Sequence, residues 1–241
     1  MESSLYVSLS GQVALQRRLD TIANNVANSS TNGFRAENVT FDSIISNTAN
    51  ASVTYSGPGR TTFSTSAGPL IQTGNPLDIA ARGDAFFAIA TPAGTVYTRD
   101  GRLRISQAGD LETMTGYPIL DSGGAPIQVN ANNGQLSIGA NGTISQNGNR
   151  VGTIGLFKLA PDARLQRGEG AGIVSDKPAE PVVDYAADGV VQGHLEGANV
   201  NPVLEITRLI AVTRAFESIS SSIDKSDGTM KEAIRTLGSG R

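Results

Sequence analysis

The two ends of the chain carry helical periodicity, and this feature limits the possible folds most strongly. Near the start, large apolar residues recur three and four positions apart, at Leu15, Leu19, Ile22 and Val26. This spacing places them on one face of a helix, predicted over residues 3–28. The helix is expected to end where Asn28, Ser29 and Ser30 cluster. Gly33 follows and is expected to take a left-handed backbone conformation.

The periodicity is stronger at the other end of the chain. Five large apolar residues alternate three and four apart, at Leu209, Val212, Phe216, Ile219 and Ile223, and the same register continues through Ser226, Met230, Ala233 and Leu237. The pattern is typical of a heptad seam. Asn201 and Pro202 are suited to the N-cap and the first helical position. Gly228 disfavours helix by about 1 kcal/mol relative to Ala, which predicts a kink or a frayed tail there.

The middle of the chain lacks helical periodicity. Residues 36–69 are mostly small and polar, and we predict a linker or an extended loop. Over residues 70–199, short alternating runs lie between glycines, with expected turns at Asp100-Gly101, Asn141-Gly142 and Asn147-Gly148. We therefore predict an α+β protein with a central, mainly antiparallel β domain.

The two helical segments are expected to pair, although they stand at opposite ends of the chain. A lone amphipathic helix is marginally stable and leaves its apolar face in water. We therefore predict that residues 1–35 and 200–241 form one helical coiled-coil inner domain, which then packs against copies of itself. The alternative is that both helices pack on the β domain as part of an ordinary core.

Composition and motifs exclude several function classes. The chain has no cysteine and one histidine, His194, which excludes disulfide scaffolds, thiolate metal sites and thiol catalysis. The net charge of −3 provides no strong attraction to nucleic acid. No P-loop is present, and Gly168, Gly170 and Gly172 do not match the dinucleotide-binding pattern. We expect no enzyme activity, no cofactor and no metal.

Two groups of charged residues leave an alternative open. Four carboxylates near predicted turns could include an acid–base pair, but solvated turn residues are the favoured interpretation; they are Asp78, Asp84, Asp100 and Asp110. Arg99, Arg102 and Arg104 alternate and could form an anion patch on one strand face, although a solvated or salt-bridged face is favoured.

The first residues predict no ordinary secretory signal. They include no basic region before an apolar run. No run of about 18 apolar residues occurs in the sequence, so we expect no membrane span.

Four ordered motifs resemble those of bacterial flagellar rod and hook proteins. The first contains Ala23, Asn24, Asn25, Asn28, Thr31, Gly33 and Phe34, and ends at Arg35. The second covers residues 73–80 and 83–87, and the third covers 97–101. The fourth contains Leu195, Glu196, Asn199, Val200 and Asn201. Because the four motifs occur in order over nearly the whole chain, the resemblance is specific to this family.

The resemblance implies a structural subunit of the flagellar basal-body rod, the shaft that crosses the periplasm. Within the family, the short length is most similar to proximal rod proteins, with distal rod proteins next. Family members are exported unfolded through the flagellar type III export apparatus, without a cleaved signal. Their partners are neighbouring rod subunits of the same and sister types, with no nucleic acid and no small-molecule substrate. A hydrolytic β protein and a secreted β-rich adhesin or effector are the rival classes.

The resemblance also gives expected roles to particular residues. Asn24, Asn25 and Asn28 could end the first helix locally or bridge to a neighbouring chain. Gly33 supplies a positive φ, and Phe34 an apolar anchor. The nine large apolar residues from Leu15 to Val26 and from Leu209 to Ile223 are predicted to form the assembly interface. In a free monomer, about 35 residues at the start and about 40 at the end are expected to be disordered or weakly helical.

Overall fold

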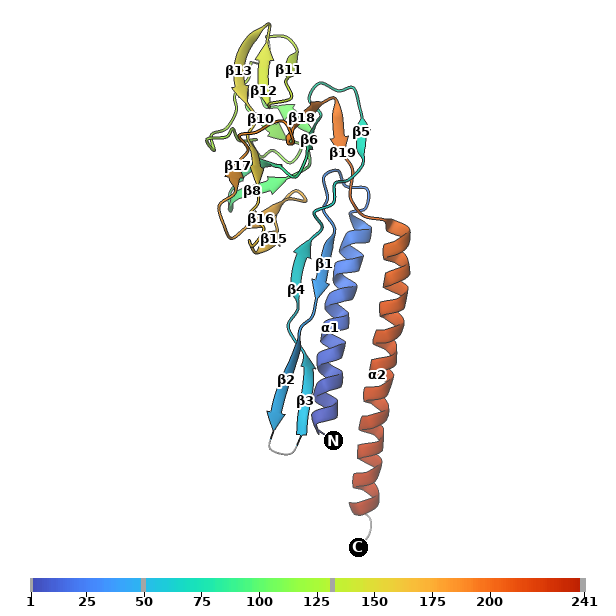
Figure 1. Cartoon of the computed structure of the whole chain (residues 1–241). Coiled ribbons are helices and arrows are strands. Elements are labelled where there is room, and N and C mark those ends of the chain that lie inside the picture. Colours follow the sequence, from blue (N-terminus) through green and yellow to red (C-terminus); the bar gives the residue numbers. More distant parts are fainter. Residues whose placement is uncertain (1, 49–50, 131–132, 239–241) are drawn as a thin grey trace. The chain divides into compact units, whose positions relative to one another are not determined.

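The computed structural model describes residues 2–48, 51–130 and 133–238 (Figure 1). It confirms an α+β protein with a mainly antiparallel β region. The chain divides into two compact units. The first, here called the helical unit, combines the chain up to Ala27 with Glu37–Thr62 and the chain from Asn201 onward. The second, the β unit, combines Asn28–Ala36 with Phe63–Val200.

The helical unit consists of two helices and two β-ribbons. Its elements are α1 (Glu2–Ala27), β1 (Glu37–Thr40), β2 (Ser43–Thr48), β3 (Ala51–Ser56), β4 (Arg60–Phe63) and α2 (Pro202–Gly238). The two helices lie side by side and run antiparallel, and the β2–β3 hairpin lies alongside α1 (Figure 1). Strands β2 and β3 pair antiparallel, with Ser43 opposite Ser56, and β1 pairs with β4.

The linker or extended loop predicted over residues 36–69 instead carries β1 to β4. Its β-branched residues, among them Val39, Ile44 and Ile45, favour strands but show no long alternation. A two-stranded ribbon is marginal by itself and needs a surface to pack on. Here α1 supplies that surface, because β1 and β3 both contact the helix. The strands therefore depend on a tertiary partner that the local sequence does not show.

Helix α2 begins where the sequence predicts and continues further than expected. The Asn201 side-chain oxygen accepts a hydrogen bond from the Leu204 backbone N–H at 3.2 Å, which confirms the N-cap. The helix passes through Gly228 and ends at Gly238. The Lys231 ammonium and the Asp227 carboxylate pair across one turn at this point, 2.6 Å apart. One glycine costs too little to end a long helix, so the expected frayed tail does not form.

The β unit contains a six-stranded sheet and several smaller ones. Its strands are β5 (Leu70–Gln72), β6 (Ile79–Arg82), β7 (Phe86–Thr91), β8 (Gly94–Thr98), β9 (Leu103–Ile105), β10 (Leu111–Thr113), β11 (Leu136–Ile138), β12 (Thr143–Gln146), β13 (Asn149–Thr153), β14 (Leu156–Lys158), β15 (Leu165–Arg167), β16 (Ile173–Ser175), β17 (Glu180–Pro181), β18 (Gly189–Gln192) and β19 (His194–Glu196). The large sheet has the order β15-β16-β8-β7-β14-β17. Strands β11, β12 and β13 form a three-stranded meander, and β10-β9, β18-β6 and β19-β5 form pairs.

The main core of the β unit is made of its own residues. It includes Ile79, Phe87, Leu111, Ile144 and Leu156, all buried. Within the described part of the chain, this cluster takes no residue from α1 or α2. The interior of the β unit is thus closed without the helices, contrary to the alternative that they belong to an ordinary core.

Two of the three predicted turns form as hairpins. Asn147 and Gly148 have φ of 49° and 80° between β12 and β13, and Gly142 has φ of 75° between β11 and β12. The turn expected at Asp100-Gly101 does not connect a hairpin, because β8 pairs with β7 and β16 while β9 pairs with β10. A Cβ on Gly101 would lie 1.7 Å from the Ile79 carbonyl oxygen. Gly101 therefore permits two backbones to approach closely, which is a different use of glycine.

Candidate assembly surface and buried ionic cluster

Helices α1 and α2 contact each other, and none of the nine apolar residues predicted for their seam is classed as exposed. Ile22 and Val212 are buried, and the other seven are partly buried. The Gln12 side-chain amide donates a hydrogen bond to the Ser220 hydroxyl at 3.1 Å. A Cβ on Gly11 would lie 3.6 Å from the Ile219 side chain, so the helices are in close contact at this level. We call the nine residues the apolar seam: Leu15, Leu19, Ile22, Val26, Leu209, Val212, Phe216, Ile219 and Ile223.

One end of the seam carries a polar junction centred on Asn25. Its amide oxygen accepts a hydrogen bond from the Glu37 backbone N–H at 2.9 Å, and its amide nitrogen donates to the Glu37 carbonyl at 2.8 Å. The same nitrogen lies 3.4 Å from the Glu205 carboxylate, which pairs with Arg208 at 2.5 Å. Asn25 and Glu205 are both buried. Asn25 thus joins α1, β1 and α2 within one chain.

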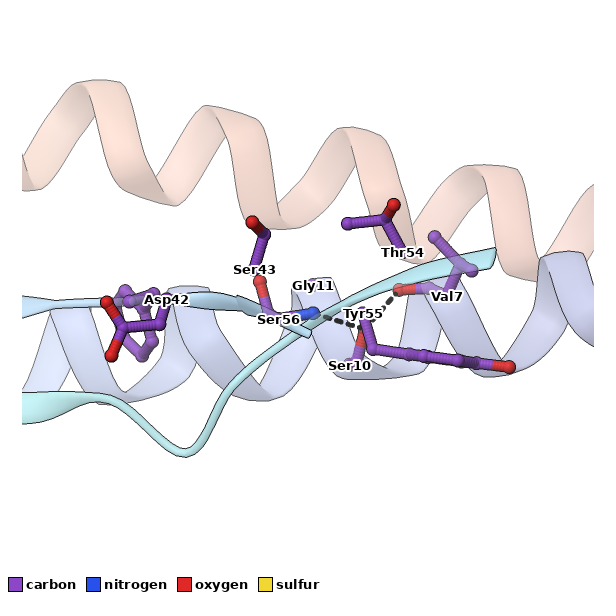
Figure 2. Close-up of a pocket in the computed structure, with 9 residues that line it drawn as sticks. Val7, Ser10, Gly11, Asp42, Ser43, Thr54, Tyr55 and Ser56 are labelled. Atoms are coloured by element: carbon purple, nitrogen blue, oxygen red, sulfur yellow. Dashed lines mark hydrogen bonds between the residues drawn. The ribbon is translucent and has the colours of Figure 1, made fainter. Parts of the chain in front are cut away.

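A shallow pocket lies between α1 and the β2–β3 hairpin (Figure 2). Its lining residues are Val7, Ser10, Gly11, Phe41, Asp42, Ser43, Thr54, Tyr55 and Ser56. The Ser10 hydroxyl donates to the Val7 carbonyl at 2.8 Å and accepts from the Ser56 backbone N–H at 3.3 Å, which attaches the hairpin to the helix. The nine lining residues include one carboxylate and no basic side chain, so they offer no acid–base pair.

A buried ionic cluster lies in the β unit. One oxygen of the Glu196 carboxylate forms an ion pair with the Arg35 guanidinium and the other with the Arg99 guanidinium, each at 2.9 Å. These three side chains are at most 2% exposed. The Gly68 backbone N–H also donates to Glu196, at 2.9 Å. We call Arg35, Arg99 and Glu196 the ionic cluster.

The second arginine of the cluster also binds backbone carbonyls. Arg99 donates to the Ala81 carbonyl at 2.9 Å and to the Gly83 carbonyl at 2.6 Å. The Phe86 ring lies 4.8 Å from the Arg99 guanidinium carbon and 5.9 Å from that of Arg35. Burial lowers the pKa of both arginines, while the Glu196 carboxylate acts in the opposite direction and raises it. Arginine stays protonated in proteins, so the cluster buries two positive charges beside one negative charge.

The segment after α1 reaches this cluster through Gly33 and Phe34. The Gly33 backbone N–H donates to the Glu196 carbonyl at 2.7 Å. Gly33 has φ of 69°, as predicted, and a Cβ there would lie 2.2 Å from the Asp100 backbone nitrogen. Phe34 is buried beneath the Arg167 guanidinium, whose carbon lies 4.3 Å from the ring. Both expected roles of Gly33 and Phe34 are therefore observed.

Asn199 completes the junction from the other end of the β unit. Its side-chain oxygen accepts from the Ala36 backbone N–H at 2.6 Å, and its side-chain nitrogen donates to the Ser66 carbonyl at 2.7 Å. All four family-like motifs thus meet around Glu196. The first motif supplies Gly33 and Arg35, the second Phe86, the third Arg99, and the fourth Glu196 and Asn199. Sequence analysis did not assign a role to Arg35. A signal was present, since an arginine ends the first motif and Glu196 is the second residue of the fourth.

The other residues singled out in the sequence have local roles. Asn28 accepts from the Thr31 hydroxyl at 3.2 Å in the turn after α1, and Leu195 is buried in β19. Ala23 is exposed, and Asn24 and Val200 are partly buried. The His194 ring nitrogen Nδ1 lies 3.0 Å from the Gln192 carbonyl oxygen.

The predicted arginine row does not form one strand face. Arg99 is buried in the ionic cluster, whereas Arg102 pairs with Asp100 at 2.6 Å and Arg104 with Glu112 at 2.7 Å. The interpretation as salt-bridged residues is therefore confirmed for Arg102 and Arg104. Alternation failed as a guide because β9 begins only at Leu103. Arg99 thus precedes the strand whose two faces the alternation assumes.

A second buried carboxylate lies near the ionic cluster. Asp188 pairs with the Lys158 ammonium at 2.6 Å and accepts from the Asp84 backbone N–H at 3.0 Å. Burial acts to raise the pKa of Asp188, but Lys158 and the backbone hydrogen bond outweigh it, so the pKa is lowered. Asp188 is therefore ionised at neutral pH.

Among the described residues, no helix is both long and apolar enough to cross a membrane. Within the same ranges, no group of three or more histidine or acidic side chains is arranged to hold a metal ion.

Family models match three parts of the chain. Residues 5–35 match the flagella basal body rod protein model, and residues 80–146 match the flagellar hook protein FlgE/F/G D1 domain. Residues 191–236 match the flagellar basal body rod FlgEFG protein C-terminal model. These regions contain the first, third and fourth motifs and the part of the second motif from residue 80 onward.

Curated relatives align over nearly the whole chain. The flagellar basal-body rod protein FlgF of Mesorhizobium japonicum is 50% identical over 99% of each chain. FlgF of Rhizobium meliloti is 44% identical over 100% of each chain. The rod protein FlgG of Bacillus subtilis is 32% identical over 97% of this chain and 98% of its own. The chain therefore belongs to the flagellar basal-body rod protein family.

Proposed function

We propose that this chain is a structural subunit of the bacterial flagellar basal-body rod, of the FlgF type, located in the proximal part of the shaft. One observation supports this function most directly: the terminal helices lie together in a unit outside the main core of the β unit, and they keep large apolar side chains exposed. A distal, FlgG-type position is the second candidate, since a FlgG relative aligns over almost the full length.

The helical unit is the assembly domain in this proposal. Helices α1 and α2 form a coiled coil through the apolar seam, and their remaining apolar faces contact other subunits around the axis of the rod. Each large apolar side chain that becomes buried on assembly contributes roughly 1.5–3 kcal/mol. Exposed examples are Tyr6, Leu9, Val13, Ile206 and Ile210. Burial at several such positions favours polymerisation.

The ionic cluster has a mechanical role in this proposal. The chain enters the β unit at Asn28 and Phe63 and leaves it after Ala36 and Val200. Segments next to the first and the last of these points bind Glu196 or Asn199. The cluster therefore anchors these two connections to the same site in the β unit. Such anchoring lets force on the helices pass into the β unit through two attached segments instead of one.

Export and partners follow from the family. We propose that the chain passes unfolded through the flagellar type III export apparatus without a cleaved signal. The lack of cysteine suits this route, because no disulfide can form before passage. The partners are copies of this chain and sister rod subunits, and the chain acts mechanically instead of catalytically.

Deletion of the gene, followed by imaging of isolated basal bodies, tests the function. The expected result is a shaft that stops short of full length in non-swimming cells, restored by the wild-type chain. Intact shafts in swimming cells would reject it. Complementing separate strains that lack FlgF or FlgG with this chain distinguishes the two rod positions, because the proposal expects rescue of the FlgF deletion alone.

A further inference from the structure

Several asparagines of the β unit are followed directly by glycine, at Asn32, Asn133, Asn141 and Asn147. Asparagine is a thermolabile residue. It is most reactive before glycine, because glycine has no Cβ to hinder attack by its own backbone nitrogen on the asparagine side chain. Such an attack needs an accessible glycine N–H and room for the turn to move. Asn133 directly follows residues 131 and 132, outside the described ranges, so we compare the other three pairs.

Two of these pairs hold the glycine nitrogen in a buried hydrogen bond. The Gly33 N–H donates to a backbone carbonyl oxygen at 2.7 Å, and the Gly142 N–H does so at 2.9 Å. Both glycines are buried. A Cβ would lie 2.2 Å from a backbone atom at Gly33 and 2.7 Å from one at Gly142, so there is little room for movement. Reaction at Asn32 or Asn141 must first break such a bond, which costs free energy.

The third pair, Asn147 and Gly148, forms the exposed turn between β12 and β13. Within the described part of the chain, no hydrogen bond holds the Gly148 N–H. A Cβ added to Gly148 would meet no atom within 4 Å. The Asn147 side-chain nitrogen donates to the Asn133 side-chain oxygen at 3.2 Å, and both side chains are exposed. This turn therefore combines an accessible nucleophile with space around it.

We propose that Asn147 is a site of spontaneous deamidation in the folded chain. Hydroxide takes the Gly148 amide proton, and the nitrogen attacks the side-chain carbonyl carbon of Asn147. A C–N bond forms and the bond to the side-chain nitrogen breaks. That nitrogen leaves as ammonia with a proton from water, which restores the hydroxide. Water then opens either C–N bond of the resulting five-membered imide and gives aspartate or isoaspartate. The net reaction consumes one water and releases one ammonia.

The product changes the turn in two ways. A carboxylate cannot donate, so the hydrogen bond to Asn133 is lost, and one negative charge is added to a chain of net charge −3. Isoaspartate also carries the backbone through the former side chain, which lengthens the turn by one carbon. Strand β13 is the edge of its meander and contributes no described residue to the main core, so the effect stays local. This chemistry goes beyond the proposed rod function and does not depend on it.

Peptide mapping of the aged full-length chain tests the site. The folded chain is kept at about pH 8 in water enriched in heavy oxygen and then digested in ordinary water, so only imides opened before digestion carry the label. Fragmentation of the peptides locates the label. We expect Asn147 to convert at least about tenfold faster than Asn32 and Asn141, because breaking a buried hydrogen bond limits those two. In urea, which frees every N–H, the three should convert at similar rates.

Asn147→Gln is the matched variant, because it keeps an amide but would have to close a larger ring. Its peptide should carry no label at position 147, and near-ultraviolet circular dichroism checks that the variant is folded. Similar rates at Asn32, Asn141 and Asn147 in the folded chain would overturn the site. Absence of conversion at Asn147 in the folded chain, over a time in which the urea-treated chain converts there, would also overturn it. Neither result would affect the rod function.

Discussion

In the β unit, Ile79, Phe87 and Leu111 have no exposed surface, whereas in the helical unit Tyr6, Leu9 and Ile210 keep about half of theirs. The polar junctions differ in the same direction. Glu196 is bound by two buried arginines and a backbone N–H within its own unit, whereas Glu205 of the helical unit pairs with the more exposed Arg208. The comparison shows one unit that is complete by itself and another whose surface is suited to further packing.

Removing the charge of Glu196 should produce the largest effect. Glu196→Gln leaves Arg35 and Arg99 buried without their carboxylate, and breaking a buried pair costs about 3–5 kcal/mol. Urea unfolding followed by near-ultraviolet circular dichroism measures the loss. Glu112→Gln, which breaks the more exposed pair with Arg104, is the control and should change stability by at most about 1 kcal/mol. Equal losses in both variants would show that the buried ionic cluster contributes no more to the free energy of unfolding than the more exposed Arg104–Glu112 pair.

Gly33→Ala should be the next most severe. The new Cβ would meet the Asp100 backbone at 2.2 Å in a left-handed conformation, so we expect a loss of about 3 kcal/mol. Gly74→Ala is a matched control, because its φ is 74° and no atom lies within 4 Å of the new Cβ. That variant should lose about 1–2 kcal/mol in the same unfolding experiment. A Gly33 variant no less stable than the control would exclude the close approach.

A substitution in the apolar seam should affect the helical unit and leave the β unit unchanged. Phe216→Ala removes a partly buried ring from the helix pair and should abolish rod assembly while the β unit stays folded. Hydrogen exchange is expected to accelerate in α1 and α2 but not at Gly33 or Ala36, whose backbone N–H groups bond within the β unit. Exposed Thr229→Ala on α2 is the control. If the Phe216 variant builds rods normally, the apolar seam is not required for assembly.

Acid should produce the smallest effect, and only in the β unit. The pKa of Asp188 is lowered in the folded chain, so its contribution is present above its unfolded pKa of about 3.9 and is lost as pH falls through the folded value. Stability measured between pH 6 and pH 3 should therefore decline less in Asp188→Asn than in wild type. Identical pH profiles would exclude Asp188 as a contributor.

The helices and their caps were predictable because their causes are local. The three-and-four spacing from Leu209 to Ile223 and the Asn201 cap lie within one segment, and both are observed. The ribbon of β2 and β3 was missed because its stability comes from α1. Arg35 was missed for a similar reason: its partner Glu196 lies far along the sequence, and no local pattern connects them.

Local spacing and backbone chemistry in the sequence alone were enough to establish two amphipathic terminal helices, a glycine-punctuated β region, the turns at Gly142 and Gly148 and the left-handed Gly33. Tertiary structure alone decided that Gly101 serves a backbone crossing, that Arg99 is buried instead of lying on a surface row, and that Asn25 joins three elements. The reason is physical: helix periodicity and turn conformation act over a few residues, whereas a buried charge or a close backbone contact depends on groups that only folding brings together.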